Sequence, residues 1–169
     1  MNKYIKCAAI ATIGLALTGC GGKKLTCSYS ESSSFKGEQN QQLTYVFSKD
    51  GKSIEKYTEV SSVNYTEKAL KYYDEDLKDV LEDAEDDCEE YEDVDFIVCK
   101  AELKGNKITQ TITYNLKGLD EDDLKDMYDD KDISYSVYSK AKKLYDKDYD
   151  DLVHDANDDD ESLYKYSCK

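Results

Sequence analysis

The sequence predicts a single α+β domain, with an antiparallel sheet of five or six strands built from hairpins and packed by two or three helices. Two stretches of alternating apolar and polar residues surround glycine-containing turns, at Asp50 and Gly51 and at Gly105 and Asn106. Apolar residues recur at spacings of three and four in residues 66–88, which is typical of a helix. Hairpins combined with such a helix favour the α+β class.

The first strands are predicted from period-two alternation. Residues 25–31 alternate, and residues 42–49 alternate again before the turn at Asp50 and Gly51. Both turn residues tolerate positive φ, so residues 53–63 are expected to return as the partner strand. A two-residue turn gives a definite register, which pairs Phe47 with Ile54, Tyr45 with Lys56 and Leu43 with Thr58.

The longest helix is predicted over residues 66–88, with Asn64 or Thr66 as its N-cap. Its other face carries Asp and Glu, and the acids near its end oppose the helix dipole, so this end is expected to fray. The apolar stripe consists of Leu70, Tyr73, Leu77, Leu81, Ala84 and Cys88.

A second hairpin is predicted around Gly105 and Asn106, where turn chemistry and alternation agree independently. After it come a helix over residues 121–128, a helical region over 137–157 and a final strand over 163–168. The register of the second hairpin pairs Leu103 with Ile108, Cys99 with Ile112 and Ile97 with Tyr114.

The N-terminus is typical of a bacterial export signal. Lys3 and Lys6 precede an apolar stretch over residues 7–17, too short to span a bilayer, which needs roughly 20 apolar residues. It ends in Leu17-Thr18-Gly19-Cys20, which looks like a lipobox with cleavage between Gly19 and Cys20. We therefore expect a signal peptide over 1–19, a lipidated tether over 20–24 and one domain over 25–169.

Lipidation of Cys20 predicts a location on the outer face of the cell membrane. Fatty acyl chains such as palmitate contribute about 0.8 kcal/mol per buried methylene, and two or more chains hold a protein stably. The chain has a formal charge of −15, which disfavours binding to nucleic acid and to anionic lipid head groups. The lipid on Cys20 is therefore the expected membrane contact.

Four further cysteines remain in the mature chain, and an even number in an exported domain predicts two disulfides. Three connectivities are open. Cys88 ends the apolar helix stripe and Cys99 lies on the core face of the next strand, so a Cys88–Cys99 bond would join helix to sheet. This leaves Cys27 with Cys168, joining the first strand to the last, while mixed pairings such as Cys27–Cys88 stay open.

No catalytic residue, metal site or cofactor is predicted. His154 is the only histidine and is interpreted as a surface residue. Residues 146–150 and 155–159 begin like calcium-binding EF-hand loops, but they lack the glycine at the sixth position and the glutamate at the twelfth. What remains is an acidic patch that could collect cations loosely.

The layout resembles the YehR-like family of small bacterial lipoproteins of unknown function. The matching features are the lipobox, a strand near Leu25, the segment 43–47 before a glycine-containing turn, the central helix, and the strand 108–116 followed by Gly118-Leu119-Asp120. The resemblance implies a lipoprotein fold and no catalytic residues. The expected role is a non-enzymatic envelope protein that presents a binding surface, with an envelope protein as one partner. The alternative is a cation- or small-ligand-binding lipoprotein.

Overall fold

The computed structural model describes residues 22–157 and 166–169. The expected signal peptide, Gly19 and Cys20 lie outside the described residues, as do residues 163–165 of the predicted last strand. Within the described part of the chain, no helix is long and apolar enough to cross a membrane.

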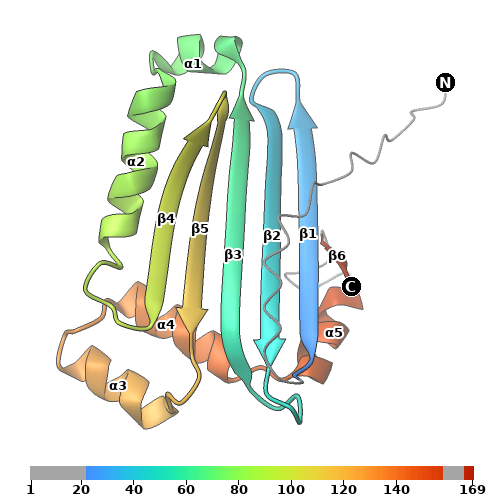
Figure 1. Ribbon diagram of the computed structural model, residues 1–169, viewed down its shortest axis with the longest axis vertical. Coiled ribbons are helices and arrows are strands. Elements are labelled where there is room, and N and C mark those ends of the chain that lie inside the picture. Colours follow the sequence, from blue (N-terminus) through green and yellow to red (C-terminus); the bar gives the residue numbers. More distant parts are fainter. Residues whose placement is uncertain (1–21, 158–165) are drawn as a thin grey trace.

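Six antiparallel strands form one open sheet in the order β4-β5-β3-β2-β1-β6 (Figure 1). This confirms the predicted fold class. The strands are β1 (Lys24–Ser33), β2 (Gly37–Phe47), β3 (Ile54–Tyr65), β4 (Ile97–Lys104), β5 (Lys107–Asn115) and β6 (Ser167–Cys168).

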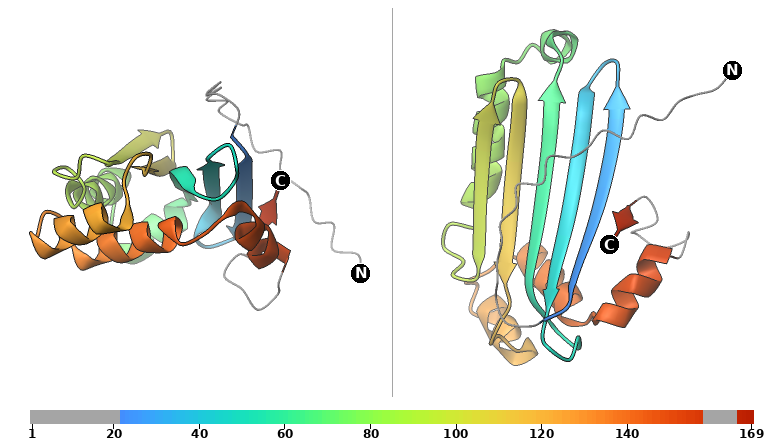
Figure 2. Two further views of the ribbon diagram at one scale, coloured as in Figure 1. Left: turned by 90° about the horizontal axis from the view of Figure 1, so that it is seen from below. Right: turned by 45° about the vertical axis from the view of Figure 1, so that its right-hand side comes forward.

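Five helices of the described residues accompany the sheet, more than the two or three expected, because each of the two longer helical segments is broken. Figure 2 shows that α2, α4 and α5 lie on the same side of the sheet. The helices are α1 (Glu67–Tyr73), α2 (Leu77–Glu89), α3 (Glu121–Asp129), α4 (Tyr135–Tyr145) and α5 (Tyr149–Asn157).

The prediction of one helix over residues 66–88 is wrong. Thr66 caps α1 as expected, but α1 ends at Tyr73, and its C-cap Asp74 has a φ of 57°. Asp76 then starts α2 through a reciprocal capping box with Asp79. Both carboxylates accept backbone N–H groups that a continuous helix would bond internally, so the cap competes with the helix and interrupts it.

The first hairpin keeps only part of its predicted register. Phe47 pairs with Ile54 as expected, but a bulge between Val46 and Phe47 shifts the rest. Tyr45 therefore lies opposite Tyr57 instead of Lys56, and Leu43 lies opposite Glu59 instead of Thr58. The extra residue brings two aromatic side chains together on the buried face, which a regular ladder would not do.

The turn of this hairpin also differs from the prediction. The Gly51 amide donates to the Ser48 carbonyl at 3.0 Å, so Lys49 and Asp50 are the central residues. Gly51 follows them with a φ of 79°, in the region that favours glycine. The second hairpin matches its prediction, because Leu103 pairs with Ile108, Cys99 with Ile112 and Ile97 with Tyr114.

The core lies between the sheet and the helices. Phe47 and Tyr57 are among its largest fully buried side chains, and α4 contributes Val137. The α2 stripe contributes less than predicted, since α2 has no buried residue. The core includes Leu25, Cys27, Leu43, Tyr45, Ile54, Val94, Phe96, Ile97, Tyr114, Leu116, Leu124, Ile133, Ala141, Leu144 and Leu152.

Candidate functional site

A group of polar side chains lies on the helix side of the sheet, where a continuous apolar layer would be expected. The view in Figure 2 (right) shows α2 beside β4 and α5 near β1 and β6, with the central strands between them. We call the group the polar window. All its members are half-buried: Tyr29 of β1, Gln39 and Gln41 of β2, Glu59 and Ser61 of β3, and Tyr166 next to β6.

Glu59 is the centre of the polar window. Its Oε1 accepts a hydrogen bond from Gln41 Nε2 at 2.5 Å, and its Oε2 accepts from the Tyr57 hydroxyl at 2.9 Å. Lys140 of α4 forms an ion pair with the same Oε2 at 3.2 Å. The Glu59 side chain is 20% exposed and that of Lys140 is 43% exposed, so the pair is only partly screened by water.

The carboxyl of Glu59 is held ionised. Burial by itself raises its pKa, but the charge of Lys140 and the hydrogen bonds from Tyr57, Lys140 and Gln41 outweigh burial and lower the pKa below the ordinary 4.5. Burial, with the negative charge of Glu59, raises the pKa of Tyr57 and Tyr45 above the ordinary 10.0. Both tyrosines therefore keep their protons, and Tyr57 acts as a donor.

This ionised state makes a prediction for acid stability. Because the folded-state pKa of Glu59 is lowered, its contribution to stability is complete above the unfolded-state pKa and is lost as pH falls through the folded-state value. We expect Glu59→Gln to reduce the free energy of unfolding near neutral pH, and the difference from wild type to shrink below about pH 4.5. Urea unfolding of the mature protein over a pH series measures both.

The matched control is Glu55→Gln on the same strand. Glu55 pairs with Lys117, whose side chain is 75% exposed, so this surface pair contributes little. A stability difference between wild type and Glu59→Gln that stays constant as the pH falls would contradict the ionised carboxylate.

Tyr166 links the C-terminal end to the polar window. Its hydroxyl donates to Gln41 Oε1, and its ring lies 5.8 Å from that of Tyr29. Tyr166 precedes β6, whose Cys168 is the register partner of Cys27 on β1 and forms a disulfide with it. The strand pairing and the disulfide therefore position one aromatic side of the window.

The two disulfides of the structure join the pairs favoured in the sequence analysis. Cys27 is bonded to Cys168 at an S–S distance of 2.05 Å, which connects β1 to β6. Cys88 is bonded to Cys99 at 1.97 Å, which connects the end of α2 to β4. The mixed pairing Cys27–Cys88 does not occur.

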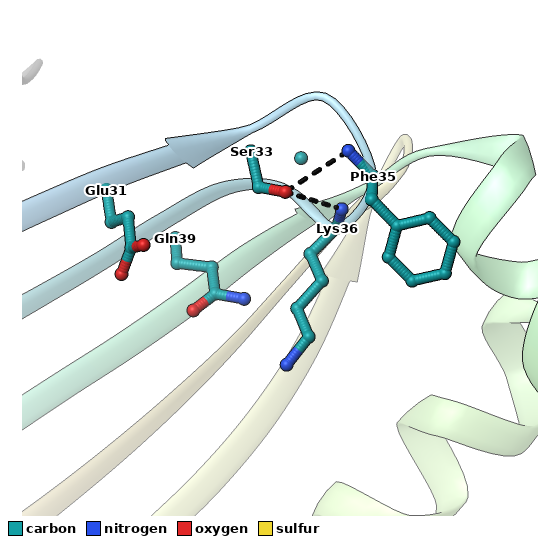
Figure 3. Close-up of a pocket in the computed structure, with 6 residues that line it drawn as sticks. Glu31, Ser33, Phe35, Lys36 and Gln39 are labelled. Carbon is teal, nitrogen blue, oxygen red and sulfur yellow. Dashed lines mark hydrogen bonds between the residues drawn. The ribbon is translucent and has the colours of Figure 1, made fainter.

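A cavity of about 290 Å³ extends the helix-side surface to the β1–β2 turn (Figure 3). Glu31 and Gln39, register partners on these strands, form one wall. Ser33 Oγ accepts hydrogen bonds from the amides of Phe35 at 3.1 Å and Lys36 at 3.3 Å, which holds the turn. Four of its six lining residues, Glu31, Ser33, Lys36 and Gln39, carry polar side chains that can form hydrogen bonds with a ligand.

The remaining sequence predictions concern His154 and the acidic segments. His154 is exposed on α5, as interpreted. Residues 146–150 connect α4 to α5 and include the start of α5, where the backbone N–H of Asp148 donates to the Asp151 carboxylate and that of Asp151 donates to the Asp148 carboxylate. Residues 158 and 159 lie outside the described chain. Among the described residues, no group of three or more His, Cys, Asp or Glu could hold a metal ion.

The comparisons with known proteins establish the fold alone. No protein-family model and no curated protein matches this sequence. An NMR structure of a protein from Streptococcus pneumoniae TIGR4 is similar, with a TM-score of 0.50 and 15% sequence identity over 100% of this chain and 97% of that chain. A likeness at this identity carries no function from one protein to the other.

Proposed function

We propose that this protein is a lipid-anchored extracytoplasmic lipoprotein, non-enzymatic, whose polar window binds a neutral envelope molecule rich in hydroxyl or amide groups. The observation that carries the proposal is the placement of Gln41, Glu59 and Tyr166 together on the sheet. Amides and hydroxyls donate and accept hydrogen bonds, and tyrosine rings offer flat apolar faces. The carboxylates Glu59 and Glu31 disfavour an anionic ligand at this surface.

The anchor is supported by the lipobox and is tested by substitution of its cysteine. We expect Cys20→Ala to move the protein from the membrane fraction to the soluble fraction, because the thiol that carries the acyl chains is removed. Fractionation and immunoblotting measure this, and mass spectrometry of the N-terminal peptide detects the lipid. Cys7→Ala, within the expected signal peptide, is the control that stays membrane-bound. Unchanged membrane association of Cys20→Ala would overturn the anchor.

Ligand binding is tested with two neighbouring glutamines of β2. Gln41 lies on the helix side, within the polar window, and Gln42 lies on the opposite side of the same strand. We expect Gln41→Ala to weaken binding of an N-acetylated chito-oligosaccharide about two- to tenfold, the effect of one lost hydrogen bond, and Gln42→Ala to leave it unchanged. NMR titration of the mature protein measures both dissociation constants and shows whether the fold is kept.

The result that contradicts the proposal is equally specific. If the sugar causes no saturable shifts at the polar window, or if Gln41→Ala and Gln42→Ala weaken binding equally, the window is not its site. The anchor experiment is independent of this outcome, because Cys20 does not belong to the window.

A further inference from the structure

The side of the sheet opposite the helices carries a net positive charge, whereas the whole chain is negative. Successive side chains of a strand point to opposite faces, so the neighbours of buried Leu25, Tyr57 and Ile108 point away from the core. We call this side the outer face. Its charged residues are Lys24 on β1, Glu38 on β2, Lys56 on β3, Lys107 on β5, and Lys100, Glu102 and Lys104 on β4.

Five lysines and two glutamates give the outer face a local charge of +3, within a chain of −15. Most of its other positions carry small hydroxyl side chains, such as Thr58 and Thr113, whose Oγ1 atoms lie 3.3 Å apart. The acids concentrate on the helices, where α2 and α3 have acidic first turns and no basic residue in the last turn. The outer face is therefore positively charged, and the negative charge of the molecule is concentrated on the helices.

No helix of the described residues covers the outer face, although Ser62 at its centre is buried. The view from below in Figure 2 (left) shows α3, α4 and α5 on one side of the strands and no labelled helix of Figure 1 on the other. Lys24, Lys100, Lys104 and Lys107 are exposed, and Lys56 is half-buried. These ammonium groups are thus available to an anionic partner.

We propose that the outer face docks on an anionic membrane surface, such as one containing phosphatidylglycerol, and so orients the anchored domain. This inference rests on the proposed lipid anchor. Only four peptide units separate Cys20 from Lys24, a span of at most about 14 Å. The tether would keep the start of β1 close to the head groups, where a lysine is attracted within about one Debye length, roughly 8 Å at physiological salt.

Docking by this face would overcome the repulsion from anionic lipid that the total charge of the chain predicts. A chain of −15 is repelled by anionic lipid when its charge is treated as uniform. In the folded protein the basic outer face can approach the membrane while the acidic helices point away from it. The polar window, on the helix side, would then face the envelope and remain accessible to its ligand.

The experiment compares lysine reactivity on two kinds of vesicle. The mature lipidated protein is reconstituted on phosphatidylcholine vesicles, with or without phosphatidylglycerol, and is pulsed with an amine-acetylating reagent read by mass spectrometry. We expect Lys100, Lys104 and Lys107 to react roughly fivefold more slowly on the anionic vesicles, and high salt to remove this protection. Lys71 and Lys143, on α1 and α4, should react equally on both.

Charge-reversal variants complete the test. Lys100→Glu with Lys107→Glu should abolish the protection of Lys104, whereas Lys71→Glu with Lys143→Glu, which makes the same change in total charge, should keep it. Equal reactivity on both vesicle types overturns the docking proposal, as does protection that also occurs on neutral vesicles, which would indicate contact with a second copy. Flotation with neutral vesicles reports the anchor alone, so failure of the anchor is distinguished from failure of docking.

Discussion

Replacing both Cys27 and Cys168 with alanine is expected to lower the free energy of unfolding by about 3–5 kcal/mol. The bond closes a sequence separation of 141 residues, so its removal releases a large entropy in the unfolded chain. In the folded state, β6 has only two residues, which pair with Cys27 and Ser28. Without the bond we expect β6 to detach and Tyr166 to lose its contact with Gln41.

The second disulfide provides the comparison. Replacing Cys88 and Cys99 with alanine opens a separation of only 11 residues, for which loop closure predicts about 2–3 kcal/mol. Guanidinium unfolding of the two double variants measures both values, and the NMR signals of Tyr29 and Gln41 report the detachment of β6. An equal or reversed order of the two losses would contradict the loop-closure explanation.

Phe47→Ala is expected to destabilise the protein by about 3–5 kcal/mol, the usual cost of removing a large buried aromatic side chain. Phe47 has 0% exposure. Its ring meets that of Tyr149 edge-on at 5.3 Å, which joins β2 to α5. The truncation would therefore leave a cavity between the sheet and the last helix, and the same denaturant titration measures the loss.

The control for Phe47→Ala is its neighbour Val46, which is half-buried on the outer face. Val46→Ala removes fewer contacts and should cost about 1 kcal/mol or less. A Phe47→Ala variant no less stable than Val46→Ala would show that the core does not depend on this ring.

The second hairpin could be predicted in full because two independent signals agree in it. The turn at Gly105 and Asn106 and the alternation on both strands demand one register, and a slip of one residue would expose every apolar side chain. The first hairpin has the same kinds of signal, but the bulge adds one residue on β3, Glu55, between the partners of Phe47 and Val46, and alternation cannot indicate it. Its benefit, the contact of Tyr45 with Tyr57, becomes visible only when both strands are in place.

The helix break could not be seen in the periodicity. Leu70, Tyr73 and Leu77 continue the spacing of three and four across the interruption, so the stripe alone predicts a continuous helix. The available signal was the Asp76–Asp79 pair, which forms the capping box of α2. The capping box therefore interrupts the helix although the apolar spacing continues, as it can where the helix face is only half-buried.

The candidate site was missed because its members come from distant parts of the chain. Glu59, Gln41, Lys140 and Tyr166 lie on two strands, a helix and the segment before β6. One signal existed: on the predicted return strand, Glu59 is two residues from Tyr57 and therefore shares its face. A charge at such a position needs a partner, but the sequence alone does not identify Lys140.

β4 lies at the edge of the sheet, and this position matters when many copies of the protein are crowded on a membrane. An uncovered edge strand offers unpaired N–H and C=O groups to a neighbouring molecule, which is a route to aggregation. Along β4, Lys100, Glu102 and Lys104 place a charge at every second position, and Cys99, just before them, is bonded to α2. An incoming strand would have to desolvate these charges, so molecules crowded in the plane of a membrane could collide edge to edge without polymerising.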